Sequence, residues 1–210
     1  MAPNTKSSVK SPAVVGIVHD TLVVNRRVEV LTNWFAKFVP SGSRILDVGC
    51  GDGLISALLR QKRQDISVQG IDVLPRANAL ISVELFDGAA LPFPDSSFDL
   101  VLLSDVLHHT ADATVLLREG RRVAKHVLIK DHYREGFAAS ARLRFMDWVG
   151  NARFGVALPY NYWTRQQWQT AWQQLSLRPE QLVTNLRLYP RPADWVFGAQ
   201  LHFIALLERN

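Results

Sequence analysis

The sequence predicts an α/β fold: a seven-stranded, mostly parallel sheet with one antiparallel edge strand and with helices on both faces. Short runs rich in aliphatic and β-branched residues alternate with stretches in which apolar residues recur every three or four positions. A glycine-rich turn joins the first of these runs directly to a helical stretch. Such alternation is typical of parallel sheets covered on both sides. The length of 210 residues, with 48% hydrophobic and 20% charged residues, suits one globular domain.

One domain is expected over residues 13–210, after a flexible tail over residues 1–12. The tail is rich in Ser, Pro, Asn and Lys and lacks the apolar core of a secretory signal. No later apolar run reaches the roughly 18 residues that a membrane span needs. The single cysteine, Cys50, cannot form an intramolecular disulfide. These features favour a cytoplasmic protein with no transmembrane segment.

The net charge of +5 is unevenly distributed along the chain. Residues 45–110 carry 4 basic and 9 acidic residues, whereas residues 111–210 carry 14 basic and 8 acidic residues. A basic second half is compatible with an anionic acceptor or with nucleic acid. Its arginines are scattered rather than gathered in a run, so nucleic acid is the less favoured partner.

A first helix is predicted over residues 24–39, because apolar residues recur there at spacings of three and four. Pro40 ends this helix. A strand over residues 44–48 follows and runs into the glycine turn and a helix over residues 54–61. Further strands of the parallel part are predicted at residues 67–72, 82–86, 98–103 and 125–130.

The part after the fifth strand has a different pattern. A helix is predicted over residues 136–148, and the stretch 150–162 is rich in Gly, Asn, Pro and Tyr. Another helix should begin at Thr164, where Thr-Arg-Gln-Gln fits a capping box. Two last strands are predicted at residues 182–189 and 201–208.

The glycine turn is the first candidate for chemistry. Asp47 ends a buried strand, and Gly49, Gly51 and Gly53 then lead into a helix. Glycines permit positive φ and close approach of a ligand to the backbone, while N–H groups at the helix start can hold an anion. A carboxylate beside such a turn needs a partner, and a ligand ammonium would supply one. The alternative is a tight strand-to-helix turn with no ligand.

Two more carboxylates follow strands. A dinucleotide site would need a third glycine where Leu54 stands, so the sequence disfavours that cofactor. Asp72 ends the second strand, where it could accept hydrogen bonds from the two hydroxyls of a ribose, or simply cap a helix. Asp87 follows the third strand in the segment Phe-Asp-Gly-Ala-Ala.

Together with the Ser-Asp-Val-Leu-His-His segment at residues 104–109 and the Arg-Arg-Val segment at residues 121–123, these motifs complete a pattern. The chain resembles the class I S-adenosylmethionine-dependent methyltransferases, and within them the small-molecule (methyltransferase type 11) group that includes ubiquinone and menaquinone biosynthesis enzymes. The resemblance covers roughly residues 26–131. It implies a Rossmann-like fold, methyl transfer, and S-adenosyl-L-methionine as cofactor. One departure is the loss of a Lys-Pro-Gly-Gly turn before the fifth strand, on the edge of the sheet away from the ligand side.

The resemblance also implies roles for individual residues. The loop from Asp47 to Gly53 would hold the methionine part of the cofactor, Asp72 its ribose hydroxyls, and Asp87 its adenine amino group. The implied cofactor-binding set is Asp47, Gly49, Cys50, Gly51, Gly53, Asp72, Val73, Asp87, Gly88, Ala89 and Ser104.

The acceptor residues do not follow from the family pattern. A cap over residues 133–163 lies where it could cover the cofactor and shape an acceptor pocket. His132 beside Asp131 is the preferred candidate for a general base, because a neutral imidazole titrates near the operating pH; His109 is the other. Each could instead be a structural histidine. The candidate acceptor-binding residues are Tyr133, Arg142, Asp147, Asn151, Tyr160 and Tyr162, and packing is the alternative role for each.

The function predicted is transfer of a methyl group to a small-molecule acceptor, anionic or aromatic in character, by in-line displacement. Such a reaction depends mainly on alignment of the reacting atoms, which can contribute roughly 7 to 11 kcal/mol. The alternatives are an RNA or protein methyltransferase, or a non-catalytic S-adenosylmethionine-binding protein. No carboxylate and histidine cluster of ligand spacing stands out in the sequence, so no metal is expected.

Overall fold

The computed structural model describes residues 25–151, 159–198 and 200–209. The tail expected over residues 1–12 lies outside these ranges. Among the described helices, none is both long and apolar enough to cross a membrane.

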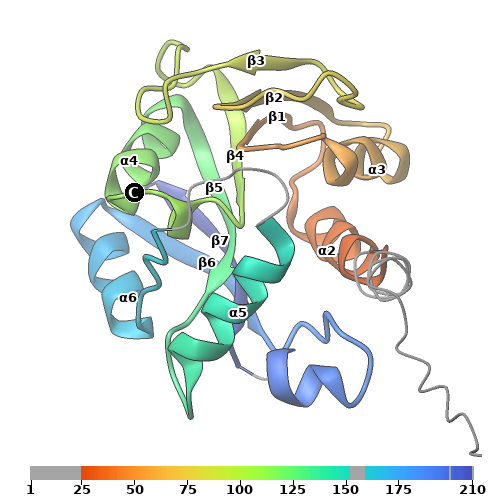
Figure 1. Ribbon diagram of the computed structural model, residues 1–210. Helices are drawn as coiled ribbons and strands as arrows, with labels where there is room; N and C mark the ends of the chain where they lie inside the picture. Colours follow the sequence, from red (N-terminus) through yellow and green to blue (C-terminus); the bar gives the residue numbers. More distant parts are fainter. Residues whose placement is uncertain (1–24, 152–158, 199, 210) are drawn as a thin grey trace, which may run out of the picture.

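The described residues form a seven-stranded sheet with the order β3-β2-β1-β4-β5-β7-β6 (Figure 1). Strands β1 to β5 pair in parallel, and β7 pairs antiparallel with both β5 and β6. The predicted seven-stranded, mostly parallel sheet is therefore confirmed, with β7 as the reversed strand and β6 beyond it at the edge. The strands are β1 (Arg44–Val48), β2 (Ser67–Asp72), β3 (Val83–Leu85), β4 (Phe98–Ser104), β5 (Ala124–His132), β6 (Leu177–Thr184) and β7 (His202–Arg209).

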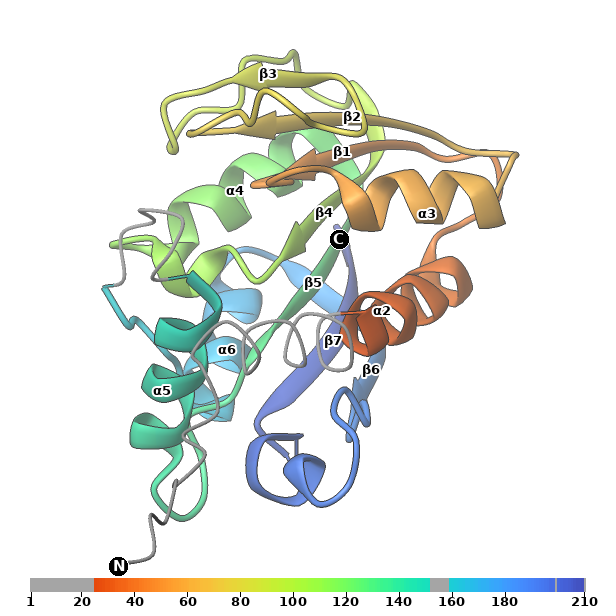
Figure 2. The same ribbon diagram turned by 45° about the vertical axis from the view of Figure 1, so that its right-hand side comes forward.

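Helices cover both faces of the sheet. Figures 1 and 2 show α2 and α3 on one side and α4 and α6 on the other. The helical elements are α2 (Asn25–Phe38), α3 (Leu54–Lys62), the short 3-10 helix η2 (Leu107–His109), α4 (Ala113–Val123), α5 (Ala139–Asn151), α6 (Arg165–Gln174) and the short π-helix η4 (Asp194–Gly198).

Two apolar clusters stabilise the layers. On one face, α4 and α6 contribute Leu117 and Trp168 to a cluster that includes Val101 and Phe203 from the sheet. On the other face, Phe35 of α2 packs in a second cluster with strand residues from β1, β4, β5 and β7. Strand residues alternate between these two clusters, as expected for a sheet buried on both sides.

Helix α5 belongs to neither cluster. Ala139 and Leu143 form a small third cluster with Tyr162 and Leu201. Near its C-terminal end, α5 approaches η2, since Asp147 lies 3.5 Å from His109. This part of α5 therefore lies over the carboxyl end of β4, which η2 follows.

The sixth strand differs from its prediction. The strand predicted at residues 182–189 includes an alternation of polar and apolar side chains over residues 185–188. The observed strand is Leu177–Thr184 and begins almost directly after α6. Pro179 is tolerated at a bulge of this edge strand, where a missing N–H costs little. Leu186 and Leu188 cause the misleading alternation. They lie in the loop after β6, and their side chains pack in the same cluster as Phe35 of α2.

The starts of helices α6 and α5 can be compared with the starts predicted from the sequence. Thr164 caps α6 with both hydrogen bonds of a capping box, which confirms the prediction there. Helix α5 begins at Ala139 rather than at residue 136. Gly136 and Ala138 both have positive φ, 91° and 48°, so the chain makes a turn before it enters the helix.

Candidate functional site

The glycine turn between β1 and α3 is held in a left-handed conformation. Gly49, Gly51 and Gly53 have φ of 71°, 61° and 73°. The Gly49 N–H donates to the Ile71 carbonyl of β2 at 2.8 Å, and the Gly53 N–H donates to the Cys50 carbonyl at 2.9 Å. The turn is therefore fixed to the end of the neighbouring strand.

The three glycines differ in the space around them. A Cβ on Gly49 would lie 2.5 Å from Cγ2 of Val106, and a Cβ on Gly53 would lie 2.5 Å from Cγ1 of Ile81. Beside Gly51, the nearest such atom is Nη2 of Arg76 at 3.7 Å. Packing accordingly requires glycine at positions 49 and 53, whereas a Cβ on Gly51 would make only an ordinary van der Waals contact with the Arg76 side chain.

Two carboxylates flank the turn. Asp47 is buried and accepts a hydrogen bond from the Ser56 hydroxyl at 2.6 Å. Burial raises the pKa of Asp47 to about 6, although Ser56 works in the opposite direction. Asp72 accepts from the Gly51 N–H and the Leu74 N–H, both at 2.8 Å, and so ties the end of β2 to the turn.

The two residues after Asp72 form a partly exposed apolar surface. Val73 and Leu74 are 55% and 57% exposed. Asp87 accepts hydrogen bonds from the backbone N–H groups of Ala89 and Ala90, each at 2.8 Å, and these bonds lower its pKa. A Cβ on Gly88 would lie 3.1 Å from Cγ1 of Val73, so the segment after β3 sits against the segment after β2.

The remaining predicted cofactor residues lie around the same turn. Ser104 ends β4, and its hydroxyl is buried with no hydrogen-bond partner among the described residues. Cys50 is half-buried, and burial raises the pKa of its thiol. A buried hydroxyl without a partner is unfavourable unless a ligand or water supplies one.

A second polar cluster occupies the carboxyl ends of β4 and β5. His108 Nδ1 lies 2.8 Å from Oδ1 of Asp131, and His132 Nδ1 lies 3.1 Å from the same oxygen. From α5, Asp147 places Oδ1 3.7 Å from Nε2 of His108 and 3.5 Å from Nε2 of His109. The structure thus brings together all three predicted catalytic candidates and adds Asp147 from the cap.

The histidines of this cluster differ in protonation. Burial works against a charge on His108, but Asp131 and Asp147 raise its pKa to about 10. For His132, burial and then Lys130 lower the pKa to about 4. At neutral pH His108 is therefore an imidazolium ion and His132 is neutral.

An ion-pair group that the sequence did not reveal lies beside these histidines. Asp105, at φ 59°, pairs with Arg27 of α2 and with the fully buried Lys130 of β5. Burial opposes the charge on Asp105, but Arg27 and Lys130 hold its pKa well below the usual range. His202 of β7 completes the group, with Nδ1 3.3 Å from Nζ of Lys130. A lysine directly after the apolar run 127–129 was the available signal for a buried ion pair.

The predicted acceptor residues separate into groups. Tyr162 is buried and donates to Oδ2 of Asp147 at 2.9 Å. Tyr160 lies under the guanidinium of Arg144, 4.5 Å from the ring centre. Arg142 donates to the Phe137 carbonyl in the loop before α5, and Tyr133 is buried and stacks on Phe203 at 4.4 Å. Asn151 is the last residue of α5, and its side chain lies outside the described residues.

Among the described residues, three side-chain groups have spacing compatible with a metal ion, each with its ligand atoms within 4.8 Å of one another. Two of them lie at η2: Asp105, His108 and His132, and His108, His109 and Asp147. The third is His126, Glu180 and Glu208. Sequence spacing did not show these groups, because the fold brings together residues that are distant in the chain.

Comparison with known proteins gives three results. Residues 46–127 match the family model described as "Methyltransferase domain". Over 110 residues the chain is 34% identical to 27-O-demethylrifamycin SV methyltransferase of Amycolatopsis mediterranei, which covers 45% of this chain and 40% of that protein. Over 137 residues it is 32% identical to 2-methyl-6-phytyl-1,4-hydroquinone methyltransferase of Synechocystis sp., which covers 60% of this chain and 38% of that protein.

The matched part is therefore less than half the length of both curated relatives. Among solved structures, an S-adenosylmethionine dependent methyltransferase from Mesorhizobium loti is similar with a TM-score of 0.65 and 20% identity. The similarity covers 87% of this chain and 100% of that one, and it shows a shared fold.

Proposed function

We propose that this chain is a class I S-adenosylmethionine-dependent methyltransferase that transfers a methyl group from this cofactor to a small-molecule acceptor. Its match over residues 46–127 to a methyltransferase domain and its similarity to curated methyltransferases support the proposal. The observation that carries the proposal is the glycine turn with its left-handed backbone, bordered by Asp47, Asp72 and the Ser104 hydroxyl, which is buried and has no hydrogen-bond partner among the described residues.

The residues around the turn fit the polar end of this cofactor. The ammonium of its methionine part would find a negative partner in Asp47, which the structure buries beside the turn. The cofactor carboxylate would meet N–H groups at the start of α3, which the helix itself leaves unpaired. Ser104 would gain the hydrogen-bond partner that its buried hydroxyl lacks within the part of the chain that the structure describes.

The other end of the cofactor fits the surface between β2 and β3. Asp72 would accept hydrogen bonds from the ribose hydroxyls in addition to those from the backbone. The exposed side chains of Val73 and Leu74 would cover one face of the adenine ring. Asp87, Gly88 and Ala89 would border its amino-group edge, and Cys50 would lie along the turn.

The bound cofactor supplies a methyl group on a positively charged sulfur, which an acceptor can displace in line. The chain's own residues align the acceptor and exclude water. We assign this task to the cap over residues 133–163, because the described part of it reaches the carboxyl ends of β4 and β5 through Asp147 and Tyr162. Basic and aromatic residues there, Arg144 and Tyr160 among them, favour an anionic or aromatic acceptor.

Calorimetry with S-adenosylmethionine tests the cofactor site. Wild type should bind with a micromolar dissociation constant, and Asp72→Asn should weaken binding at least tenfold. Glu84→Gln, an exposed carboxylate on β3, serves as the matched control and should leave binding unchanged. Absence of binding to wild type would contradict the proposal.

A screen of acceptors tests the second part of the proposal, which is that the methyl group goes to a small molecule. Release of S-adenosylhomocysteine should occur with a low-mass acceptor. If instead RNA alone were methylated, with affinity falling steeply with salt, the small-molecule assignment would be wrong.

A further inference from the structure

We propose that His126, Glu180 and Glu208 bind a zinc ion, which joins strands β5, β6 and β7 at the end of the sheet away from η2. This site is independent of the proposed methyl transfer. His126 lies six residues before His132 on β5, a separation of about 20 Å along an extended strand. The ion would therefore stabilise the fold and take no part in the reaction.

Three neighbouring strands bring the ligand atoms together. His126 of β5 pairs with Glu208 of β7 in the antiparallel register, so their side chains lie on the same face of the sheet. Glu180 lies at the bulge of β6, between Pro179 and Gln181, which pair with consecutive residues of β7. A bulge of this kind redirects a side chain. Glu180 reaches His126 from there, with Oε2 3.7 Å from Nε2.

The spacing of the ligand atoms suits zinc. Each of the three residues offers one nitrogen or oxygen atom, and these atoms lie within 4.8 Å of one another. Zinc binds histidine nitrogen and carboxylate oxygen at about 2.0–2.2 Å in a tetrahedron, which places neighbouring ligand atoms about 3.4 Å apart. The 3.7 Å between His126 and Glu180 is longer than a hydrogen bond but close to this value. Small side-chain rotations would complete a three-ligand set, with water in the fourth position.

The ring of His126 is oriented for this role. Its Nδ1 lies 3.3 Å from the carbonyl oxygen of Asp99. A carbonyl oxygen only accepts, so Nδ1 carries the hydrogen and Nε2 of the neutral ring directs a lone pair at Glu180. A cation between that lone pair and the carboxylate relieves their repulsion, and a proton and zinc compete for the position. Histidine ligands of metals commonly donate their other ring N–H to such a carbonyl.

The carboxylate of Glu208 is ionised and is paired with cations that can move away. Arg178 donates to Oε2 at 2.8 Å, and Nζ of Lys125 lies 3.4 Å from Oε1. Arg178 and Lys125 lower the pKa of Glu208. Their side chains are 62% and 64% exposed, so water screens both ion pairs. Lys125 would leave Oε1 to a divalent ion while Arg178 keeps Oε2.

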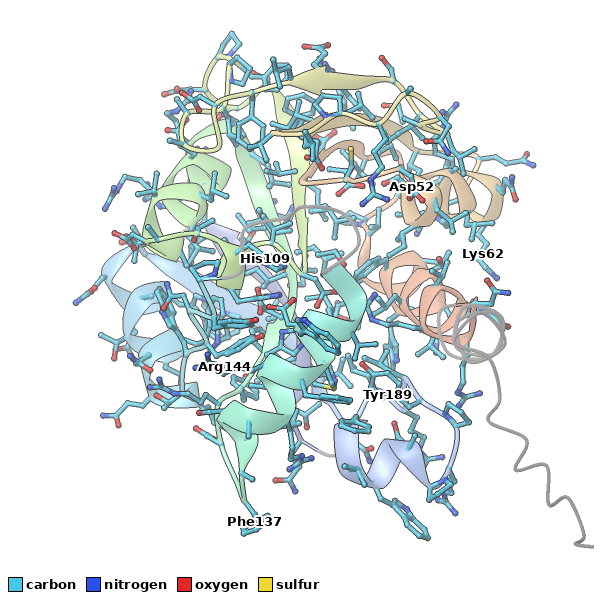
Figure 3. All side chains as sticks on the ribbon, viewed as in Figure 1. Asp52, Lys62, His109, Phe137, Arg144 and Tyr189 are labelled. Carbon is cyan, nitrogen blue, oxygen red and sulfur yellow. The ribbon has the colours of Figure 1, made fainter. Side chains whose placement is uncertain are left out.

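The two metal-spaced groups at η2 have a different charge environment. In Figure 3, His109 marks this region, beside the upper end of α5. Asp105 there already pairs with Arg27 and with the fully buried Lys130. His108 is itself charged at neutral pH. Since Lys130 cannot move into water, a divalent ion would add positive charge at a low dielectric constant, which favours zinc at His126 instead.

The chain departs from the family pattern at this same place. Residues 124–126 enter β5 directly as Ala-Lys-His, where the resemblance implies a Lys-Pro-Gly-Gly turn. This departure puts an imidazole at the start of β5, facing the edge strand β6. β6 is mostly exposed, and an ion that bridges it to β5 and β7 would add binding energy to its pairing with β7.

Zinc binding to the full chain, free of any affinity tag and treated with EDTA, provides the first test. In calorimetry, wild type should bind zinc with a micromolar dissociation constant. Zinc at about 100 times this constant should raise the thermal midpoint by about 5–10 °C. Absence of zinc binding would overturn the proposal.

Variants then locate the ion. His126→Gln and Glu180→Gln should each weaken zinc affinity by more than about tenfold. Glu84→Gln is the matched control for Glu180, because β3 is the edge strand on the other side of the sheet, and it should bind zinc like wild type. The quantity compared is the change on adding zinc, so the stability of each variant itself does not enter. Wild-type affinity in Glu180→Gln would contradict the assignment.

A further variant separates this site from η2. His108 belongs to both groups there, and a folded His108→Gln should keep the zinc affinity of wild type. Loss of zinc binding in that protein, with retention in His126→Gln, would place the ion at η2 and overturn the proposal. S-adenosylmethionine binding should be the same in EDTA as in zinc. Failure of cofactor binding would contradict the proposed function and leave the zinc site standing.

Lys125 provides a test of opposite sign. Lys125→Ala removes the competing cation from Glu208, so zinc should bind about two- to fivefold more tightly. Lys62→Ala, exposed at the end of α3, is the control and should leave the affinity unchanged. ¹⁵N NMR should show that zinc shifts Nε2 of His126 while Nδ1 keeps its hydrogen. Weaker binding in Lys125→Ala, or coordination through Nδ1, would refute the geometry proposed.

Discussion

Gly49 and Gly42 have nearly the same φ, 71° and 69°, but different surroundings. A Cβ on Gly49 would meet Val106 at 2.5 Å, whereas a Cβ on Gly42 would have nothing within 4 Å. Gly42→Ala should therefore cost only the left-handed conformation, about 1–2 kcal/mol of unfolding free energy. Gly49→Ala should cost about 1–3 kcal/mol more through steric overlap. Urea unfolding of the pair measures the difference, and equal losses would show that Val106 yields easily.

Asp47 shows a conflict between stability and binding at one residue. Its pKa is raised to about 6 by burial, above its value in the unfolded chain, so folding favours the protonated form. Stability is then highest at low pH, falls as pH rises from about 4 to about 6, and stays reduced above that range. Asp47→Asn should remove this loss and stabilise the free protein at pH 8 by about 1–3 kcal/mol.

The same substitution should weaken S-adenosylmethionine binding, because the amide offers no negative charge to an ammonium. Denaturant unfolding at pH 4 and pH 8 checks the first effect, and calorimetry checks the second. Glu29→Gln, exposed on α2, is the control and should change stability by less than about 0.5 kcal/mol. A loss of stability in Asp47→Asn at pH 8 would mean that Ser56 stabilises the charge more than burial opposes it.

At the residue scale, prediction from sequence succeeded where function is local. Asp47 and the glycines lie within seven residues of one another, and a strand followed by a glycine turn is enough to place them together. The contact between His109 and Asp147 joins residues far apart in the chain and depends on how α5 packs. No periodicity or motif encodes that packing. The sequence therefore indicated Asp147 and His109 separately, but not the contact between them.

At the scale of an element, α6 depends on its first turn. Thr164 accepts from the Gln167 N–H, and the Gln167 side chain accepts from the Thr164 N–H. Thr164→Ala should lower the unfolding free energy by about 1 kcal/mol, since it leaves helix N–H groups unpaired. Thr170→Ala, at an exposed position of the same helix, is the matched control and should be neutral or slightly stabilising. Equal effects of the two changes on the thermal midpoint would argue against the cap.

The accuracy of the predicted bounds differs from strand to strand. β1 and β2 have the predicted bounds, and β1 is a short, mostly buried run with a clear end at the glycine turn. β6 was displaced because it lies at the edge and is mostly exposed, so its sequence shows little apolar pattern. The last two residues of β5, Asp131 and His132, were missed because the strand continues through polar residues that are buried in the cluster around η2.

For the whole molecule, the charged cluster predicts an alkaline limit to stability. His108 has a folded pKa of about 10, above the ordinary value of 6.5, so its contribution is complete below about pH 6.5 and is lost as pH rises through 10. Between pH 7 and 10 it should add a slope of about −1.4 kcal/mol per pH unit to the unfolding free energy. Urea unfolding across this range should give a flatter profile for His108→Gln than for wild type. His126→Gln should keep the wild-type slope; identical slopes in all three proteins would show that His108 is neutral in the fold.

The position of β7 between β5 and β6 affects how the chain must be made. On a ribosome, β1 to β5 emerge before β7, and they already contain the glycine turn and its carboxylates. Until residues 202–209 appear, the N–H and C=O groups along one edge of β5 lack their strand partner and can pair with another nascent chain. Lys130 also lacks its final cover from His202 during that interval. β7, which follows the other six described strands in the chain, therefore fills the position between β5 and β6, and truncation before it yields an aggregation-prone product rather than a smaller working enzyme.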